Sequence, residues 1–68
     1  MLKEERQQKI LERLYASGKV QVVPLAREFE SSQDTIRRDL TDLEDQGFLK
    51  RVYGGAVPVR TVVPGFDG

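Results

Sequence analysis

The stretch from Ser32 to Gly47 constrains the fold more than any other part of the chain. Its apolar residues Ile36, Leu40 and Leu43 recur at intervals of four and three, so they share one face of an α-helix. Ser32 precedes this pattern as a predicted N-cap, and Gly47 follows it as a helix stop. The opposite face is polar and carries two adjacent arginines. The pattern therefore predicts an amphipathic helix with one buried face and one wet, hydrogen-bonding face.

Two further helices are predicted upstream of this one, which itself covers about 33–46. The first covers about 3–17 and ends at Gly18. The second covers about 23–29, with Pro24 in its first turn, where a missing N–H does no harm. Their buried sides are predicted to be Ile10, Leu11 and Leu14 in the first, and Leu25, Ala26 and Phe29 in the second. The short polar break between the second and third helices is the sequence form of a helix-turn-helix.

Short β-strands are predicted at about 20–22, 49–53 and 56–59. Gly54-Gly55 is read as the two-residue turn of a hairpin, and Pro58 limits the returning arm to an edge or a strand end. The first strand is too short to stand alone, so its partner is expected in this hairpin. The order of elements predicts a mainly α fold with a small β-hairpin wing, a winged helix-turn-helix.

The length of 68 residues suits one small domain, predicted over 1–59, with 60–68 as a linker. Because the sequence has no cysteine or histidine, it excludes a disulfide, a Cys/His zinc site and a Cys–His catalytic pair. No enzyme activity and no cofactor are expected. No apolar run approaches the roughly 20 residues that span a membrane, and the charged N-terminus is unlike a secretory signal. We expect a cytoplasmic protein with no membrane partner.

The net charge is zero, with 11 basic and 11 acidic residues, whereas domains that bind nucleic acid are often basic. The charges are unevenly distributed. Residues 46–60 hold three cations and no acids, and residues 41–45 hold three acids and no cation. An anionic partner would therefore meet a local cationic patch.

Arg37 and Arg38 carry the strongest chemical signal, because a guanidinium group matches both the guanine edge and the phosphate. Which of the two reads bases is open from the sequence. The competing interpretation is a solvated helix face on which Arg38 pairs with Asp34 and Asp42 at i, i+4. In the DNA-binding interpretation, Asp34 orients Arg38 toward a base.

The complete set of predicted DNA contacts comprises Ser32, Gln33, Asp34, Thr35, Arg37, Arg38 and Thr41 on the third helix, Lys50, Arg51, Tyr53, Gly54 and Gly55 on the wing, and Arg6. Several of these have a structural alternative. Ser32 suits an N-cap, Arg51 has Asp39 and Glu44 as possible ion-pair partners, and Arg6 has equal claims to a phosphate and to an internal partner.

The chain resembles the DNA-binding domain of the DeoR family of bacterial transcriptional regulators over nearly all of residues 6–57. The matching residues are Arg6, Ile10, Gly18-Lys19-Val20, Leu25-Ala26, Ser32, Thr35-Ile36-Arg37-Arg38-Asp39-Leu40, Leu43-Glu44, Gly47, Arg51 and Tyr53-Gly54-Gly55-Ala56. Departures are Glu30 and Ser31, where the family commonly has a glycine and an apolar residue, Tyr53, where it often has histidine, and Pro24, where it usually has an acid.

The resemblance implies sequence-specific binding to a double-stranded DNA operator and repression of sugar-metabolism genes. It also implies a phosphorylated-sugar effector, bound by a C-terminal domain that these residues do not include. The full-length protein is then expected to be a homo-oligomer and this fragment a monomer. A winged-helix module that binds protein and not DNA is the alternative, which zero net charge permits. Apolar residues exposed on the third helix or the wing would favour that alternative.

Overall fold

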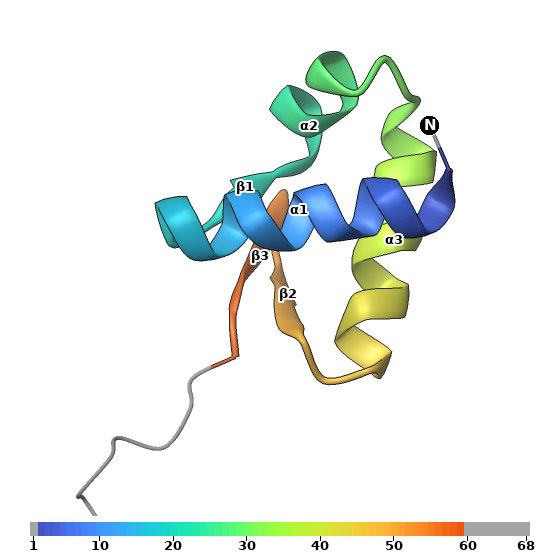
Figure 1. The fold of residues 1–68 in the computed structure, drawn as a ribbon. Coiled ribbons are helices and arrows are strands. Elements are labelled where there is room, and N and C mark those ends of the chain that lie inside the picture. Colours follow the sequence, from blue (N-terminus) through green and yellow to red (C-terminus); the bar gives the residue numbers. More distant parts are fainter. Residues whose placement is uncertain (1, 60–68) are drawn as a thin grey trace, which may run out of the picture.

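The computed structural model describes residues 2–59, so the predicted linker 60–68 lies outside the described residues. Three helices and three strands follow in the order α1 (Lys3–Ser17), β1 (Val20–Gln21), α2 (Val22–Glu28), α3 (Gln33–Asp45), β2 (Leu49–Val52) and β3 (Gly55–Pro58). In Figure 1, α1 crosses α3, α2 lies at one end of α3, and the β2–β3 hairpin lies beside α3. The predicted winged helix-turn-helix is confirmed.

The three strands form one antiparallel sheet in the order β1-β3-β2. Val20 pairs with Ala56, which confirms that the first strand finds its partner in the hairpin. Pro58 is the last residue of the central strand, the strand end that its missing N–H requires. The sheet thus joins the segment before α2 to the wing after α3.

The hairpin turn differs from its prediction. Tyr53 and Gly54 form the turn, and Gly55 is a buried residue of β3, paired with Val52 and with Gln21. Gly54 has a φ of 77°, the left-handed value that the second position of such a turn favours in glycine. The helix and strand bounds after α1 differ from the prediction by a residue at one end or both. Helix α2 begins at Val22, whose N–H donates to the carbonyl oxygen of Gly54 over 2.9 Å.

The core lies between the three helices and the sheet. It consists of Ile10, Leu14, Val20, Val22, Leu25, Ala26, Ile36, Leu40, Leu43, Leu49 and Ala56, with Leu11 and Phe29 partly buried against it. The predicted apolar faces of the three helices are therefore confirmed. Asp39 is the one charged residue buried among the described residues.

Helices α2 and α3 end in the same backbone motif but with different residues at its strained position. After α2, Ser31 N–H donates to the Ala26 carbonyl oxygen, and Glu30 N–H donates to that of Arg27. These are the two hydrogen bonds of a Schellman motif, which requires a left-handed residue at its centre. Glu30 fills that place with a φ of 53°, whereas glycine fills it after α3. The turn between α2 and α3 is well hydrogen-bonded, although Glu30 is strained there.

Replacing Glu30 by glycine is expected to stabilise the domain. A left-handed L-residue costs about 1–2 kcal/mol, part of which is offset because glycine has more freedom in the unfolded chain. We expect Glu30→Gly to raise the free energy of unfolding by about 0.5–1 kcal/mol and the melting temperature by about 3–5 °C, measured by circular dichroism. Glu30→Ala keeps the Cβ atom and is the control; an equal gain in that variant would assign the effect to the lost charge.

Candidate nucleic-acid interface

The exposed face of α3 begins at a capped N-terminus. The Ser32 hydroxyl accepts the backbone N–H of Thr35 over 3.1 Å, which confirms the predicted N-cap. Gln33 and Asp34 are exposed in the first turn, and Thr35 is half-buried. The cap fixes where this first turn starts, so it sets the direction in which the polar side chains leave the helix.

The two arginines of α3 differ in their surroundings. Arg37 donates from Nη1 to Asp34 Oδ1 over 3.2 Å and from Nη2 to Gln33 Oε1 over 3.3 Å. The predicted partnership of Asp34 with Arg38 is therefore wrong, because Arg37, one turn away at i+3, takes the carboxylate. Arg38 is exposed and makes no side-chain hydrogen bond or ion pair within residues 2–59. The Arg38–Asp42 pair of the competing interpretation is not formed either, since Lys3 pairs with Asp42.

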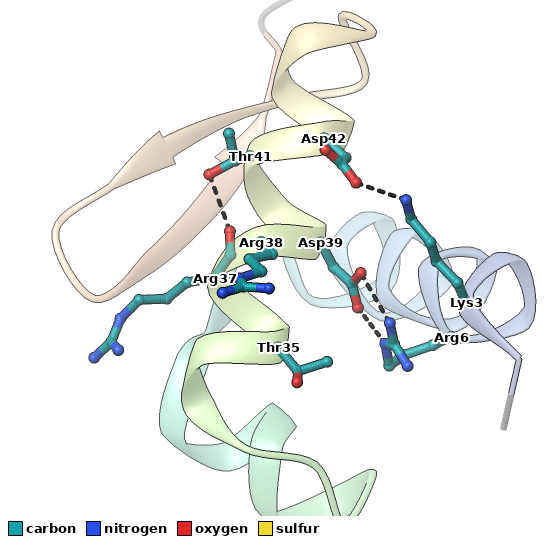
Figure 2. A pocket seen from close by; sticks show the side chains of 8 residues that line it. All are labelled: Lys3, Arg6, Thr35, Arg37, Arg38, Asp39, Thr41 and Asp42. Carbon is teal, nitrogen blue, oxygen red and sulfur yellow. Dashed lines mark hydrogen bonds and ion pairs between the residues drawn. The ribbon is translucent and has the colours of Figure 1, made fainter.

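A cleft of about 490 Å³ runs along α3 on the side of α1. It is lined by Lys3, Arg6, Thr35, Arg37, Arg38, Asp39, Thr41 and Asp42. Figure 2 shows Lys3 and Arg6 reaching α3 from α1, while Arg37 extends on the side of the hairpin. Lys3 Nζ lies 3.0 Å from Asp42 Oδ2, and this hydrogen bond raises the pKa of Lys3. Both carboxylates of the cleft thus have a cation from α1.

Arg6 is part of an internal ion pair. Its Nε and Nη2 atoms both donate to the carboxylate of Asp39, the second over 3.0 Å, and Gln7 Nε2 donates to the same group over 3.4 Å. The two charged side chains are only 14% and 3% exposed. The hydrogen bond to Asp39 raises the pKa of the Arg6 guanidinium against the opposing effect of burial. The sequence left open whether Arg6 contacts a phosphate or an internal partner, and in the structure it pairs with an internal partner.

The wing lies on the other side of α3 and bounds a second groove of about 360 Å³. Its lining consists of Val22, Val23, Gln33, Arg37, Arg51, Val52, Tyr53 and Gly54. Tyr53 at the hairpin turn is fully exposed, and Lys50 is exposed on β2. Gly55 is buried, because the backbone of β1 covers it; the close approach that it permits is to β1 and not to an outside partner. The position expected for Gly55 at the tip is therefore corrected.

Arg51 pairs with neither of its candidate carboxylates through its guanidinium. Nη1 donates to Thr41 Oγ1, and only the backbone N–H of Arg51 donates to Glu44. Asp39 is engaged by Arg6. Thr41 and Arg51, both predicted to contact DNA, thus contact each other.

Most acids of α3 have a partner in the described part of the chain, whereas two nearby cations do not. Asp39 and Asp42 are each bound by a cation of α1, and Glu44 by a backbone N–H. Arg38 and Lys50 have no such partner within residues 2–59 and point to solvent. Two exposed cations without a carboxylate partner in this part of the chain therefore lie on or beside α3, although the sum of charges is zero.

Lys3 and Asp39 were not among the predicted site residues. Asp39 lies three residues after Ile36 and four before Leu43, inside the apolar stripe of α3. A carboxylate in that stripe requires a buried cation, a signal that the sequence already contains. The sequence contains no comparable signal for Lys3, because its place beside α3 depends on how α1 crosses that helix.

Residues 2–59 show neither of two features that would indicate another kind of site. None of their helices has the length and apolar character needed to cross a membrane. No cluster of three or more acidic side chains in this part of the chain is placed to hold a metal ion.

A capped amphipathic helix with an exposed polar face, preceded by a short helix and turn and followed by a β-hairpin, defines a winged helix-turn-helix domain. The model of the DeoR-like helix-turn-helix domain matches residues 6–62, and the chain belongs to this family.

The relatives of the chain are transcriptional regulators. It is 42% identical over 62 residues to the uncharacterized HTH-type transcriptional regulator FruR of Bacillus subtilis, which covers 91% of this chain and 25% of the relative. It is 45% identical to the HTH-type transcriptional regulator GlpR of Haloferax volcanii, covering 91% and 24%. It is 41% identical to the lactose phosphotransferase system repressor of Streptococcus mutans, covering 82% and 22%. The chain thus spans about a quarter of their length. No solved structure matches significantly.

Proposed function

We propose that this domain binds double-stranded DNA sequence-specifically, with α3 in the major groove and the wing on the adjacent backbone. The observation that carries the proposal is the exposed N-terminal half of α3, where Gln33, Arg37 and Arg38 stand between two clefts. An α-helix fits the major groove, and arginine and glutamine are side chains that read base edges there. On the wing, Lys50 and Tyr53 are exposed beside this helix and suit phosphate contacts.

The polar character of this face favours DNA over a protein partner. The exposed residues of α3 are polar or charged along its length. The exposed apolar residues of the wing, Val52 and Tyr53, line a groove that also contains two arginines, a glutamine and two valines. Protein interfaces instead have an apolar centre from which charged residues are depleted.

In the whole protein we propose a cytoplasmic repressor of sugar-metabolism genes that binds its operator as a homo-oligomer. Support comes from the lactose phosphotransferase system repressor, whose name states both the target and the sign of regulation. A phosphorylated sugar, bound outside these residues, is the proposed effector. Two linked domains would bind two half-sites and raise the modest affinity of one domain. A reporter gene under the native promoter, measured with and without the regulator, tests the sign.

Removing both arginines of α3 is expected to weaken DNA binding about thirtyfold, close to the loss of one good bidentate contact. The variant is Arg37→Ala with Arg38→Ala, and the measurement is fluorescence anisotropy with a duplex selected from a random pool. Binding of the wild-type domain should fall steeply as salt rises, because phosphate contacts release counterions. The double variant should also show a shallower salt dependence.

The matched control is Lys9→Ala with Lys19→Ala, which removes the same charge from exposed positions outside both clefts of α3. This control is expected to retain most of the affinity. An equal loss in the two variants would show a general charge effect, and unchanged affinity of the folded arginine variant would refute the role proposed for α3.

A further inference from the structure

Arg51 joins the wing to α3 at two points. Its Nη1 atom donates to Thr41 Oγ1 over 3.0 Å, and its backbone N–H donates to Glu44 Oε2, also over 3.0 Å. Thr41 and Glu44 are three residues apart, so they are neighbours on one face of α3. A single residue of β2 is therefore attached to successive positions along the helix.

The side chain of Arg51 is directed toward α3 by the strand itself. Successive side chains of β2 alternate between faces, so Arg51 shares a face with buried Leu49, whereas Lys50 points to solvent. Arg51 is half-buried, and its Nε atom is fully buried with no hydrogen-bond partner within residues 2–59. Leaving a buried donor unsatisfied is costly, and the contact with Thr41 is what holds the guanidinium there. Arg51 thus differs from its neighbour Lys50, whose side chain is exposed.

The hydroxyl group of Thr41, the acceptor in this contact, makes a second hydrogen bond within α3. Its hydroxyl donates to the carbonyl oxygen of Arg37 over 3.0 Å, which Figure 2 also shows, and so its lone pairs are left to accept from Arg51. A hydroxyl has one hydrogen, and in this arrangement it is not available to a phosphate oxygen. The hydroxyl hydrogen of Thr41 and one Nη1 hydrogen of Arg51 are thus both used inside the domain.

We propose that Arg51 is a positioning residue that fixes the wing against α3, with Thr41 as its acceptor, and does not itself touch DNA. The inference rests on the proposed function. The hairpin is held at its far end as well, where Val22 N–H donates to the Gly54 carbonyl oxygen over 2.9 Å. The backbone positions of Tyr53 and Arg37, which line one groove, are therefore kept in one relative orientation before DNA arrives. Such preorganisation raises affinity by lowering the cost of ordering on binding.

The test uses Arg51→Met, Thr41→Val and the double variant that carries both changes. The control is Lys50→Met, which removes the same charge from the neighbouring residue of β2. Binding of a selected duplex is titrated over a range of salt. Arg51→Met and Thr41→Val should each lower affinity about tenfold, near the effect of one hydrogen bond to a charged group. The combination should be no worse than either, because both remove one contact. The salt dependence should stay at the wild-type slope in all three and become shallower by about 0.9 in Lys50→Met, the value of one phosphate contact.

A shallower slope in Arg51→Met, with affinity unchanged in Thr41→Val, would overturn the proposal and make Arg51 a phosphate contact. Unchanged affinity in both would also overturn it. Residual dipolar couplings of the DNA-free domain provide a readout that does not depend on the proposed function. They should show the hairpin reoriented or less ordered relative to α3 in both variants. A wild-type orientation in both would refute the positioning role even if the wild-type domain bound no DNA.

Discussion

Asp39→Ala is expected to unfold most of the domain at 25 °C. The substitution leaves the Arg6 guanidinium, 14% exposed, without the carboxylate that compensates its charge. Breaking a buried ion pair by removing one partner costs about 3–5 kcal/mol. A core in a domain below about 70 residues rarely supplies more than that. Circular dichroism with urea or heat as the denaturant measures the loss.

Two further variants separate the buried charge from other effects of the change. Asp34→Ala removes an exposed carboxylate from the same helix and is expected to cost less than about 1 kcal/mol. Arg6→Leu with Asp39→Leu removes both charges and should recover much of the stability, because a buried ion pair is often replaceable by apolar residues. If Asp39→Ala melted at the same temperature as Asp34→Ala, the ion pair between Arg6 and Asp39 would contribute nothing measurable to stability.

The sequence predicted what depends on local spacing. The apolar stripe of α3, the Ser32 cap and the glycine after the helix each follow from residues within a few positions of one another. For the same reason the three helices were located to within a residue or so. The pairing of β1 with the hairpin was also predictable, since a two-residue strand has no other source of hydrogen bonds.

The sequence did not predict which charges would meet. Local spacing allows Arg38 to pair with Asp34 or Asp42. In the structure Asp34 pairs with Arg37, and Asp42 pairs with Lys3. For Asp42 the choice depends on how α1 crosses α3, which brings Lys3 from the start of the chain to α3. For Asp34 the choice is between two local neighbours, and Arg37 at i+3 takes the carboxylate. Exposed i, i+4 pairs contribute only tenths of a kcal/mol. They are therefore easily displaced by another local neighbour, as at Asp34, or by a partner from tertiary packing, as at Asp42.

The two adjacent glycines of the hairpin show a second limit of local rules. The sequence pattern predicts both as turn residues, since a glycine pair is a strong hairpin signal. Gly54 does occupy the turn, with its left-handed φ. Gly55 instead occupies a position in β3 where only a missing Cβ atom lets β1 approach. Sequence spacing cannot distinguish a glycine needed for its dihedral angles from one needed for space.

Gly55→Ala is therefore expected to cost at least about 3 kcal/mol, the upper part of the usual range for overpacking. A Cβ atom at this position would overlap the carbonyl oxygen of Val20 and lie 3.0 Å from Gln21 Cα. Both obstacles are backbone atoms, which no side-chain rotation can move aside. Relief requires β1 to leave β3, which would break the short pairing that joins the start of α2 to the wing. Urea unfolding of the purified variant measures the cost.

Gly54→Ala is the matched control, because the added methyl group meets nothing within 4 Å and only the φ of 77° is unfavourable. Its cost should be near 1 kcal/mol, the penalty for one left-handed L-residue. Gly54→Asn should cost less still, since asparagine tolerates that conformation. The two neighbouring alanine variants thus differ by about 2 kcal/mol if Gly55 is needed for space and not for conformation. Equal costs would mean that β1 can move away from β3 without a loss of stability, and that this pairing contributes little to the fold.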